Sequence, residues 1–400
     1  MGNLVAMKTL SGRWLALGFL VGLGILAGQG FSRFTFGLLF PRMGASLVGT
    51  TSGASLLAAF YAAAYLVGVA ALIFVTRHVA PLRLLVSGVV VSTIGLLSIG
   101  LARSESVVIV GLVVAGLGAA FTYVPALSFI GAAVQGVNRS KAIGLAGAGI
   151  GAGILTARVL EIVFRAESTV NGWRGVWVSE AVIGAIASAA ILWYSFRVPS
   201  SVEDRGVLFT TIFRMPHWVA LGMAYFCFGA AYSIYSNLAV KGWELGGLNG
   251  SQAANSLLLV APAQICGGFL LLWLARHFGI RRVIVASYVL LALALGEVGL
   301  KTQSIVLSAP SAISFGLVVA GIPAQSVLVV RSRLEKQRIS RDATTTVFGV
   351  ITLMYAVGGL FGLLGGAQLS KGHGALTSTF FVAVLIALVG GLCARRGAAD

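Results

Sequence analysis

Long apolar runs alternate with short polar segments along the whole chain. An apolar run of about 20 residues is long enough to cross the hydrocarbon core of a membrane as an α-helix. Twelve runs approach or exceed that length, so the pattern predicts an all-α membrane protein with twelve transmembrane helices. The predicted helices cover residues 14–40, 51–76, 82–102, 106–130, 141–165, 175–196, 216–240, 252–275, 282–300, 304–330, 343–368 and 375–394.

A polar segment divides these helices into two sets of six. Residues 197–215 include Pro199 and Asp204 and are too polar to cross a membrane. We therefore predict an N-terminal six-helix bundle at 1–196, a cytoplasmic linker at 197–215 and a C-terminal six-helix bundle at 216–400.

Two short motifs occur in both halves of the chain. Residues 77–83, Arg-His-Val-Ala-Pro-Leu-Arg, are similar to residues 276–282, Arg-His-Phe-Gly-Ile-Arg-Arg, at an offset of 199. The hexapeptide Gly-Leu-Val-Val-Ala-Gly occurs at 111–116 and again at 316–321, at an offset of 205. Because self-similarity at a fixed period indicates a structural repeat, the two bundles are predicted to be pseudo-symmetric.

The composition excludes a soluble protein and explains the high net charge. Only 10% of the residues are charged, against about a quarter in a soluble globular protein. The net charge is +17, but most of the 28 Lys and Arg residues fall in segments that a cytoplasmic N-terminus would place inside the cell. This bias predicts that both termini are cytoplasmic, in a plasma or inner cell membrane. The partner of the chain is the lipid bilayer, and no nucleic acid is predicted.

The sequence offers no pattern for a cofactor. The three cysteines, Cys227, Cys266 and Cys393, lie in apolar spans and are interpreted as small core residues. The four histidines lie near helix ends or in loops and have no metal-ligand spacing. No metal, disulfide or organic cofactor is predicted. The glycine-rich run of the fifth helix, around Gly147 and Gly149, is interpreted as a surface for close helix packing.

Two six-helix repeats in the same orientation are a recurring plan of secondary transporters. In that plan the substrate binds near the membrane midplane, and the two halves rock to expose it to each side in turn. The first and fourth helices of each half, here helices 1, 4, 7 and 10, are expected to line the substrate path.

Several features of the chain are similar to the major facilitator superfamily. They are the twelve spans, the basic loops after helices 2 and 8, and the pair Trp173-Arg174 that enters helix 6. Residues 30–34 and 38–41, with residues 224–226, resemble the YbfB/YjiJ-type permeases of that superfamily. The resemblance implies transport by alternating access, without a covalent step. The loop motif of the superfamily carries an Asp that braces the inward gate, and this Asp is missing at 76–78 and at 276–277. Leu112 stands where a frequent helix 4 motif has an arginine, and helix 5 lacks the Gly-Pro pair of drug antiporters, so neither proton coupling nor drug export follows.

Arg33 is the most unusual residue of the first helix. It lies eight residues before Pro41, about 12 Å of helix from the outer end. An arginine inside a membrane is costly and marks a substrate pathway by default. We predict that Arg33 binds substrate; the alternatives are a structural ion pair or a side chain that reaches the outer headgroups.

The offset of 199 places Arg33 opposite Tyr232 and Phe36 opposite Tyr235 in the two copies. Gln29 precedes Arg33 by one helical turn, and Tyr225 shares a face of helix 7 with Tyr232. Polar groups also lie beside prolines in helices 4 and 10. The predicted substrate-binding residues are therefore Arg33, Gln29, Tyr232, Tyr235, Tyr123, Gln325 and Tyr225. The alternative for the tyrosines is ordinary aromatic packing or an interfacial belt.

Three further charged residues are candidates for coupling or ion pairing. Arg158 and Glu161 are three residues apart and can form an ion pair within helix 5. Glu180 in helix 6 has no obvious partner in the sequence and is the stronger candidate for a proton carrier. A pair between Arg33 and Glu161 or Glu180 is also open.

These residues predict a secondary active transporter, not an enzyme, that moves a small organic anion and possibly a coupling proton or ion. Arginine favours a carboxylate because its guanidinium can bind both carboxylate oxygens. One alternative is an exporter of amphipathic or cationic compounds, with Glu180 as the cation site. Another is a membrane sensor or scaffold that does not transport. The protein is expected to function as a monomer.

Overall fold

The computed structural model of the protein describes residues 13–44, 51–164, 171–197, 209–300, 305–337, 343–369 and 375–398. Within these ranges the regular secondary structure is helical, and no strand is present. Twelve of the described helices are long and apolar enough to cross a membrane. The predicted fold class, an all-α protein with twelve membrane-spanning helices, is confirmed. The side on which the termini lie stays a prediction.

The chain divides into two compact units, each described here by itself. The first unit comprises Met1–Thr211 and Arg338–Gly349, and the second comprises Ile212–Gln337 and Val350–Asp400. Of the predicted linker 197–215, residues 198–208 lie outside the described residues, and the 3₁₀ helix η3 covers Phe209–Arg214.

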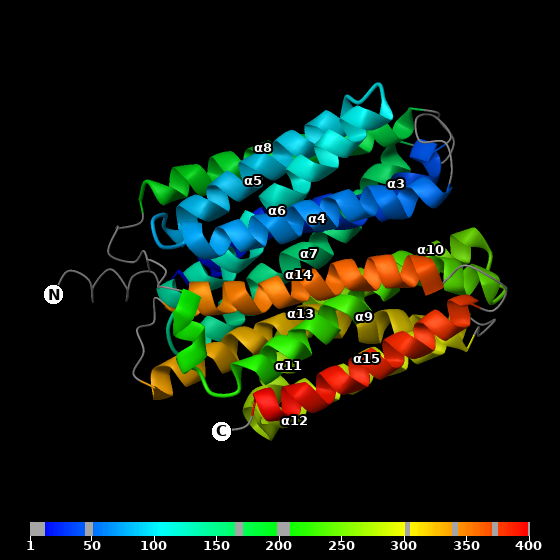
Figure 1. Ribbon diagram of the computed structural model, residues 1–400. Helices are drawn as coiled ribbons and strands as arrows, with labels where there is room; N and C mark the ends of the chain where they lie inside the picture. The colour runs from blue at the N-terminus through cyan, green and yellow to red at the C-terminus, as the bar shows by residue number, and fades with distance from the viewer. Residues whose placement is uncertain are drawn as a thin grey trace. The chain divides into compact units, whose positions relative to one another are not determined.

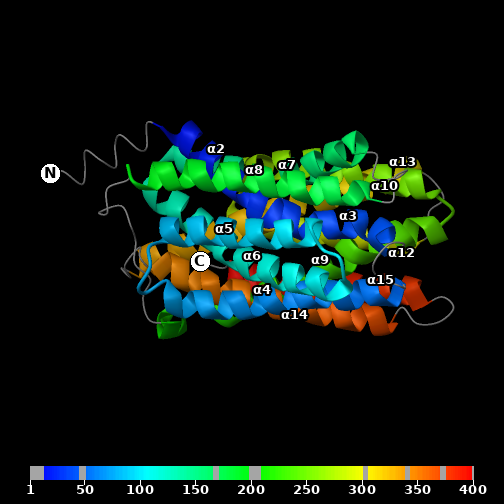
Figure 2. The same ribbon diagram turned by 90° about the horizontal axis from the view of Figure 1, so that it is seen from above.

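The first unit contains the helices of the first six spans. They are α2 (Trp14–Ile25), the π-helix η1 (Leu26–Phe31), α3 (Ser32–Gly44), α4 (Thr51–Val75), α5 (Pro81–Gly100), α6 (Glu105–Ala133), α7 (Val137–Val163) and α8 (Gly172–Ser195). Within this unit α5 packs against α6 and α8, α4 packs against α6, and α2 packs against α7, as can be followed in Figures 1 and 2.

The second unit contains the remaining spans. They are α9 (Trp218–Leu245), α10 (Gly250–Leu258), α11 (Val260–Phe278), α12 (Ile280–Gly299), α13 (Ile305–Lys336), α14 (Ala343–Leu369) and α15 (Ala375–Gly397). The first turns of α14 are grouped with the first unit. Here α12 packs against α13 and α15, and α11 packs against α13, so the second bundle repeats the helix neighbours of the first.

Two predicted helices are interrupted. The first span is not one regular helix, because its middle, Leu26–Phe31, is π-helical. The eighth span divides at Leu259 into α10 and α11. Pro262 follows this break, and a proline has no backbone N–H to donate to the carbonyl four residues earlier, which explains the division.

Close glycine contacts join the first and fifth helices of each bundle. Gly30 faces the backbone of Gly153 on α7 so closely that an added Cβ would overlap it. Gly229, 199 positions after Gly30, faces the backbone of Tyr355 and Gly359 on α14 in the same way. The partners of the two glycines are offset by 355 − 153 = 202 and 359 − 153 = 206, so the superposition at an offset of 199 stays a prediction.

The identical hexapeptides, in contrast, are not structurally equivalent. Gly116 packs against the carbonyl of Tyr61 on α4, and Gly316 packs against the carbonyl of Val260 on α11. These pairs give offsets of 316 − 116 = 200 and 260 − 61 = 199. Gly111, which the hexapeptide offset of 205 matches to Gly316, faces α5 instead. The sequence offset of 205 is therefore not the offset between structurally equivalent residues, because helix packing and not a short apolar identity determines which residues correspond.

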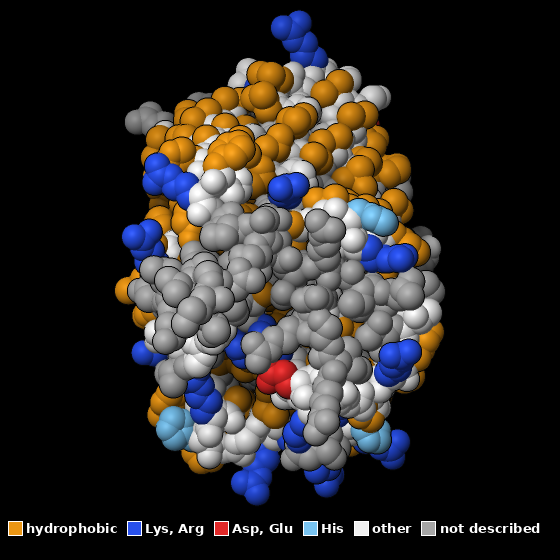
Figure 3. Space-filling model, turned by 90° about the vertical axis from the view of Figure 1, so that its left-hand side faces the viewer, with side chains coloured by type: hydrophobic (Ala, Val, Ile, Leu, Met, Phe, Trp, Pro, Cys, Tyr) orange, Lys and Arg blue, Asp and Glu red, His pale blue; other side chains and the backbone are white. Residues whose placement is uncertain are grey.

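The outer surface of each bundle is apolar, as a lipid environment requires. Large side chains are widely exposed on the helices; Ile186 is 64% exposed in the first unit and Leu293 is 63% exposed in the second. Figure 3 shows that Lys and Arg side chains are spread over one face of the molecule, where acidic side chains are scarce. The apolar surface and the basic helix ends together fit a chain embedded in a bilayer.

Candidate functional site

Arg33 lies at the start of α3, directly after the π-helical segment. Its guanidinium carbon is 5.8 Å from the centre of the Tyr65 ring on α4, within the range of a cation–π contact. The Arg33 side chain is half-buried. π-Helical turns are rare and frequently occur at functional sites, because the extra residue changes which side chains share a face. The sequence predicts neither this turn nor Tyr65.

A pair of hydroxyl groups holds α3 to α4 beside Arg33. Ser32 Oγ donates to the Gly28 carbonyl at 2.7 Å, and it lies 3.2 Å from the Tyr61 hydroxyl on α4. Because the Ser32 hydrogen is used on Gly28, Tyr61 must be the donor of the second bond. Tyr61 and Tyr65 are one helical turn apart, a spacing from which the sequence alone could have indicated a shared polar face.

Glu180 is buried completely on α8 and accepts a hydrogen bond from α3. Thr35 Oγ1 donates to Glu180 Oε1 at 2.6 Å, and both side chains are 0% exposed. Glu180 Oε2 has no hydrogen-bond partner in the structure. Trp177, one turn earlier on α8, also has an unpartnered indole N–H. The predicted alternative in which Glu180 pairs with Arg33 is absent from the described interactions, and Thr35, which the sequence analysis did not identify, takes that place.

The other N-terminal candidates differ in their surroundings. Gln29 lies in the π-helical segment, and its Nε2 donates to the Ala119 carbonyl on α6 at 2.8 Å. One end of the Gln29 amide is therefore engaged in helix packing. Tyr123 on α6 is buried, at 9% exposure.

The predicted ion pair within helix 5 is present. Arg158 Nη1 lies 2.5 Å from Glu161 Oε2 on α7, and the Glu161 side chain is buried. Mutual neutralisation of two charges inside a membrane helix is a sufficient structural reason for the pair.

The C-terminal candidates form an aromatic cluster, composed of Tyr225, Phe228, Tyr232, Phe315 and Tyr355. Tyr355 on α14 lies 5.5 Å from Tyr225 and 6.0 Å from Tyr232, measured between ring centres. Tyr232 stacks on Phe315 of α13 at 5.5 Å. Aromatic packing, the alternative left open by the sequence, therefore accounts for the contacts of these rings, whatever further role their hydroxyls have.

Tyr235 meets the aromatic cluster at Phe315 and also takes part in a hydrogen-bond network. Its ring stacks on Phe315 at 3.9 Å, and its hydroxyl lies 3.0 Å from Ser311 Oγ. Ser311 donates to the Ala294 carbonyl, so Tyr235 is the donor to Ser311. Glu297 accepts a 3.1 Å hydrogen bond from Trp243 and is half-buried. The hydroxyl of Tyr235 therefore donates its hydrogen bond to Ser311, a residue of the same bundle.

Two buried glutamines have unsatisfied amide atoms. Gln325 on α13 is 0% exposed, and its Nε2 donates to Ser287 on α12 at 3.3 Å, while its Oε1 has no partner. Gln264 on α11 is also 0% exposed, and neither end of its amide has a partner. Unpaired buried polar atoms are costly, so each is a candidate contact for a polar ligand.

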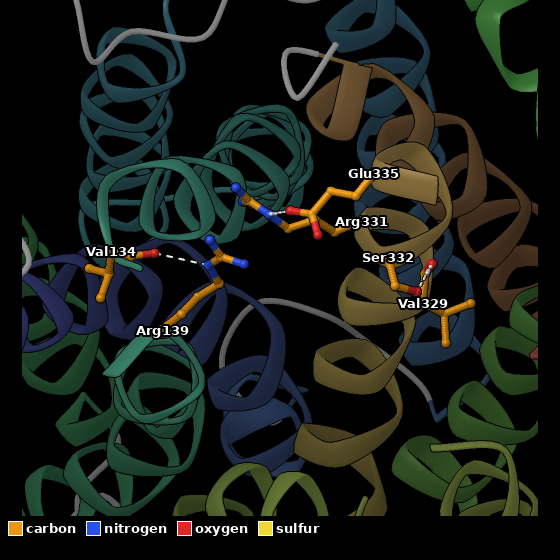
Figure 4. A network of polar contacts seen from close by, with 6 residues as sticks. All are labelled: Val134, Arg139, Val329, Arg331, Ser332 and Glu335. Carbon is orange, nitrogen blue, oxygen red and sulfur yellow. Dashed lines mark hydrogen bonds and ion pairs between the residues drawn. The ribbon is translucent and has the colours of Figure 1, made fainter. Parts of the chain in front are cut away.

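Arginines near the basic helix ends have short-range contacts of their own, shown in Figure 4. In the first unit Arg139 Nε donates to the Val134 carbonyl at 2.9 Å. In the second unit Arg331 and Glu335 form an ion pair at 3.3 Å, one turn apart on α13. Each of these two contacts lies within a single unit.

The described residues contain no cluster of three His, Cys, Asp or Glu side chains that could hold a metal ion. In the first unit, polar residues of α3 form two groups of contacts. Arg33 and Ser32 contact Tyr65 and Tyr61 on α4, and Thr35 contacts Glu180 on α8.

Comparison with known proteins gives a family and a fold. Residues 25–395 match the family model described as "Uncharacterised MFS-type transporter YbfB". The structure is similar to FucP, an MFS transporter in the outward conformation, with a TM-score of 0.70 and 15% identity over 96% of this chain and 99% of FucP. It is also similar to the proton:xylose symporter XylE bound to 6-bromo-6-deoxy-D-glucose, with a TM-score of 0.74 and 11% identity over 96% of this chain and 95% of XylE. No curated protein sequence matches the chain.

Proposed function

The chain belongs to the family of YbfB-type transporters of the major facilitator superfamily, and we propose that it is a secondary transporter of a small organic anion that binds at Arg33. The family makes the protein a membrane transporter of a small molecule. The substrate class rests on one observation. A half-buried arginine stands inside the first membrane span, directly after a π-helical turn and beside two tyrosines.

The chemistry of this position favours a carboxylate. The planar guanidinium of Arg33 donates two parallel hydrogen bonds to a carboxylate, which an ammonium or an amide cannot reproduce. The hydroxyls of Ser32 and Tyr61 lie beside it as additional polar groups. The same proposal places the protein in the cell membrane with both termini in the cytoplasm. The protein would work as a monomer and by alternating access.

A proton is the proposed coupling ion, and Glu180 is its proposed carrier. Its carboxyl is completely buried and has one hydrogen bond, so charge on it is costly. A neutral Glu180 also repels an anion at Arg33 less than a charged one does. We therefore expect anion affinity to rise as the pH falls, and by linkage the bound anion to raise the affinity for the proton.

Ligand-dependent thermal stability of the purified protein tests the anion proposal. The panel contains lactate, gluconate, succinate, citrate, glucose, choline and tetraphenylphosphonium. We expect a carboxylate to stabilise the protein, and Arg33→Gln to weaken its binding roughly 10–100-fold, because a hydrogen bond to a charged group is worth about 1.5–3 kcal/mol. Arg33→Lys should retain part of the affinity. The control is Arg83→Gln, which removes an exposed arginine from the first turn of α5. Undiminished anion binding by Arg33→Gln would overturn the proposal.

A second candidate function is export of amphipathic cations. The unpartnered Glu180 Oε2 favours it, because a buried carboxylate attracts a cation. In that case tetraphenylphosphonium, and no carboxylate, should stabilise the protein, and Glu180→Gln should remove the effect.

A further inference from the structure

The hydroxyl of Thr35 does not form the bond that helix hydroxyls usually form. Serine and threonine side chains in a helix commonly donate to the carbonyl four residues earlier. Among the described residues of the first unit six hydroxyls do so; they belong to Ser32, Thr93, Ser98, Thr122, Thr156 and Ser188. Thr35 donates across to Glu180 on α8 instead. Its hydroxyl therefore links two membrane helices.

Arg33 lies between two such links. Ser32, the residue before it, is bonded to Tyr61 on α4, and Thr35, two residues after it, is bonded to Glu180 on α8. Arg33 and Thr35 are about 200° apart around the helix, so the guanidinium and the hydroxyl point to different neighbours. These two bonds join α3 to α4 and to α8, so a change in either bond favours a rotation of α3 about its own axis.

The segment that precedes α3 allows such a rotation. In η1 the backbone is π-helical, and π-helical turns can revert to regular helix by a shift of one residue. Gly28 and Gly30 of this segment pack closely against α6 and α7, so the rotation begins after these two contacts, at the end of η1. A small rotation starting at η1 would move Arg33 and Thr35 together.

From these contacts we propose that Thr35 is a positioning residue, which transmits the protonation state of Glu180 to α3 and so controls the exposure of Arg33. This inference deepens the proposed function, because it names the residue that joins the proton site to the anion site.

The direction in which pH moves α3 follows from the strength of the hydrogen bond between Thr35 and Glu180. A hydrogen bond to an ionised carboxylate is roughly twice as strong as one to a neutral group. Charged Glu180 holds Thr35, and with it α3, against α8. Protonation weakens this bond and releases α3, which exposes Arg33 to an anion.

Glu180 has no ionic partner among the described charged residues of the helices around it. The helices packed against α8 are α2, η1, α3, α5 and α7. Their ionisable residues are Arg33 and Arg42 on α3, Arg83 on α5, and Arg139, Lys141, Arg158 and Glu161 on α7, while α2 and η1 have none. Arg174 on α8 itself donates to the carbonyls of Gly100 and Ala102. None of the described side chains forms an ion pair with Glu180, so Thr35 is its direct contact.

A fluorescent label on α3 tests the inference without any anion. Gly37 lies one turn after Arg33, is exposed, and has open space where a side chain would extend. Cys227, Cys266 and Cys393 are first replaced by Ala, and Gly37→Cys then carries a fluorophore whose own emission does not depend on pH. We expect a single pH-dependent step in its emission. The amplitude of this step should fall at least about fivefold in Glu180→Gln and in Thr35→Val. A factor of about five is the smallest effect that coupled sites typically have on each other.

Rescue and control variants separate positioning from general damage. Thr35→Ser keeps the hydroxyl and should retain the step, whereas Thr35→Ala should lose it as Thr35→Val does. A label at Gly365→Cys on α14, where space is also open, should show no step. A full step in Thr35→Val, no step in the parent protein, or no recovery in Thr35→Ser would each overturn the inference. Because the label reports on α3 alone, these failures are distinct from a failure of anion binding in the thermal assay.

Discussion

The two bundles share a packing scheme but differ in the chemistry placed on it. At the offset of 199, Arg33 corresponds to Tyr232, Ser32 to Ala231 and Thr35 to Ile234. The first bundle therefore has a cation and hydroxyls where the second has an aromatic ring and apolar side chains. After duplication, backbone contacts constrain the small residues of both copies, whereas the side chains beside them remain free to diverge in function.

The same contrast extends to the second helix of each bundle. Tyr61 and Tyr65 on α4 correspond to Val260 and Gln264 on α11. Tyr61 forms a hydrogen bond with Ser32 and Tyr65 a cation–π contact with Arg33, whereas the amide of Gln264 has no hydrogen-bond partner. Charged chemistry is thus concentrated in the N-terminal bundle, and neutral polar groups stand at the matching positions of the C-terminal bundle.

The shared packing can be broken most severely at the close glycines. An added Cβ at Gly149 would overlap the Gly22 carbonyl, whereas Gly147, two residues earlier on α7, has open space. We expect Gly149→Ala to destabilise the protein by about 1–3 kcal/mol or more, because the two backbones must separate. Gly147→Ala should be neutral or slightly stabilising. Thermal unfolding of the two variants provides the measurement.

The C-terminal bundle offers the matching test. Gly358 on α14 faces the Phe226 carbonyl, and Gly365 on the same helix has open space. Gly358→Ala should lower the melting temperature as strongly as Gly149→Ala, and Gly365→Ala should not. Similar losses from Gly149→Ala and Gly147→Ala, or from Gly358→Ala and Gly365→Ala, would contradict a shared packing scheme.

The ion pair of α7 distinguishes structural charge from functional charge in the first bundle. Glu161→Gln leaves Arg158 without its carboxylate and should cost roughly 3 kcal/mol. The double variant Arg158→Leu with Glu161→Leu should recover most of that stability, since both charges are removed together. Chemical or thermal denaturation measures both. If the double variant is as unstable as Glu161→Gln, the pair has a role beyond mutual neutralisation.

The smallest expected effect concerns Gln264. Replacing it by Leu removes two unpartnered polar atoms from a buried position, so Gln264→Leu should be neutral or stabilise the protein by about 1 kcal/mol. Tyr65→Leu, at the corresponding position of the first bundle, should instead be destabilising. A destabilised Gln264→Leu variant would mean that the Gln264 amide already forms hydrogen bonds in the folded protein and is not available to a ligand.

Much of the fold was predictable because each membrane helix must satisfy its own backbone hydrogen bonds and present an apolar surface to lipid. Each run of about 20 apolar residues meets these requirements by itself, so the number and approximate limits of the helices followed from the pattern. The ion pair of Arg158 and Glu161 was predictable for the same reason, since it lies within one helical turn. Arg33 was found because charge is rare in such runs.

Contacts between helices could not be derived in this way. The sequence determined the twelve spans, the duplication and the unusual position of Arg33. Only the tertiary structure decided that Glu180 meets Thr35, 145 positions away, and not Arg33, and that Tyr61 and Tyr65 approach Arg33 from α4. It also replaced the hexapeptide register of 205 by 200. The physical reason is that a helix fixes its own side-chain directions, whereas its rotation against its neighbours is set by the packing of all of them together.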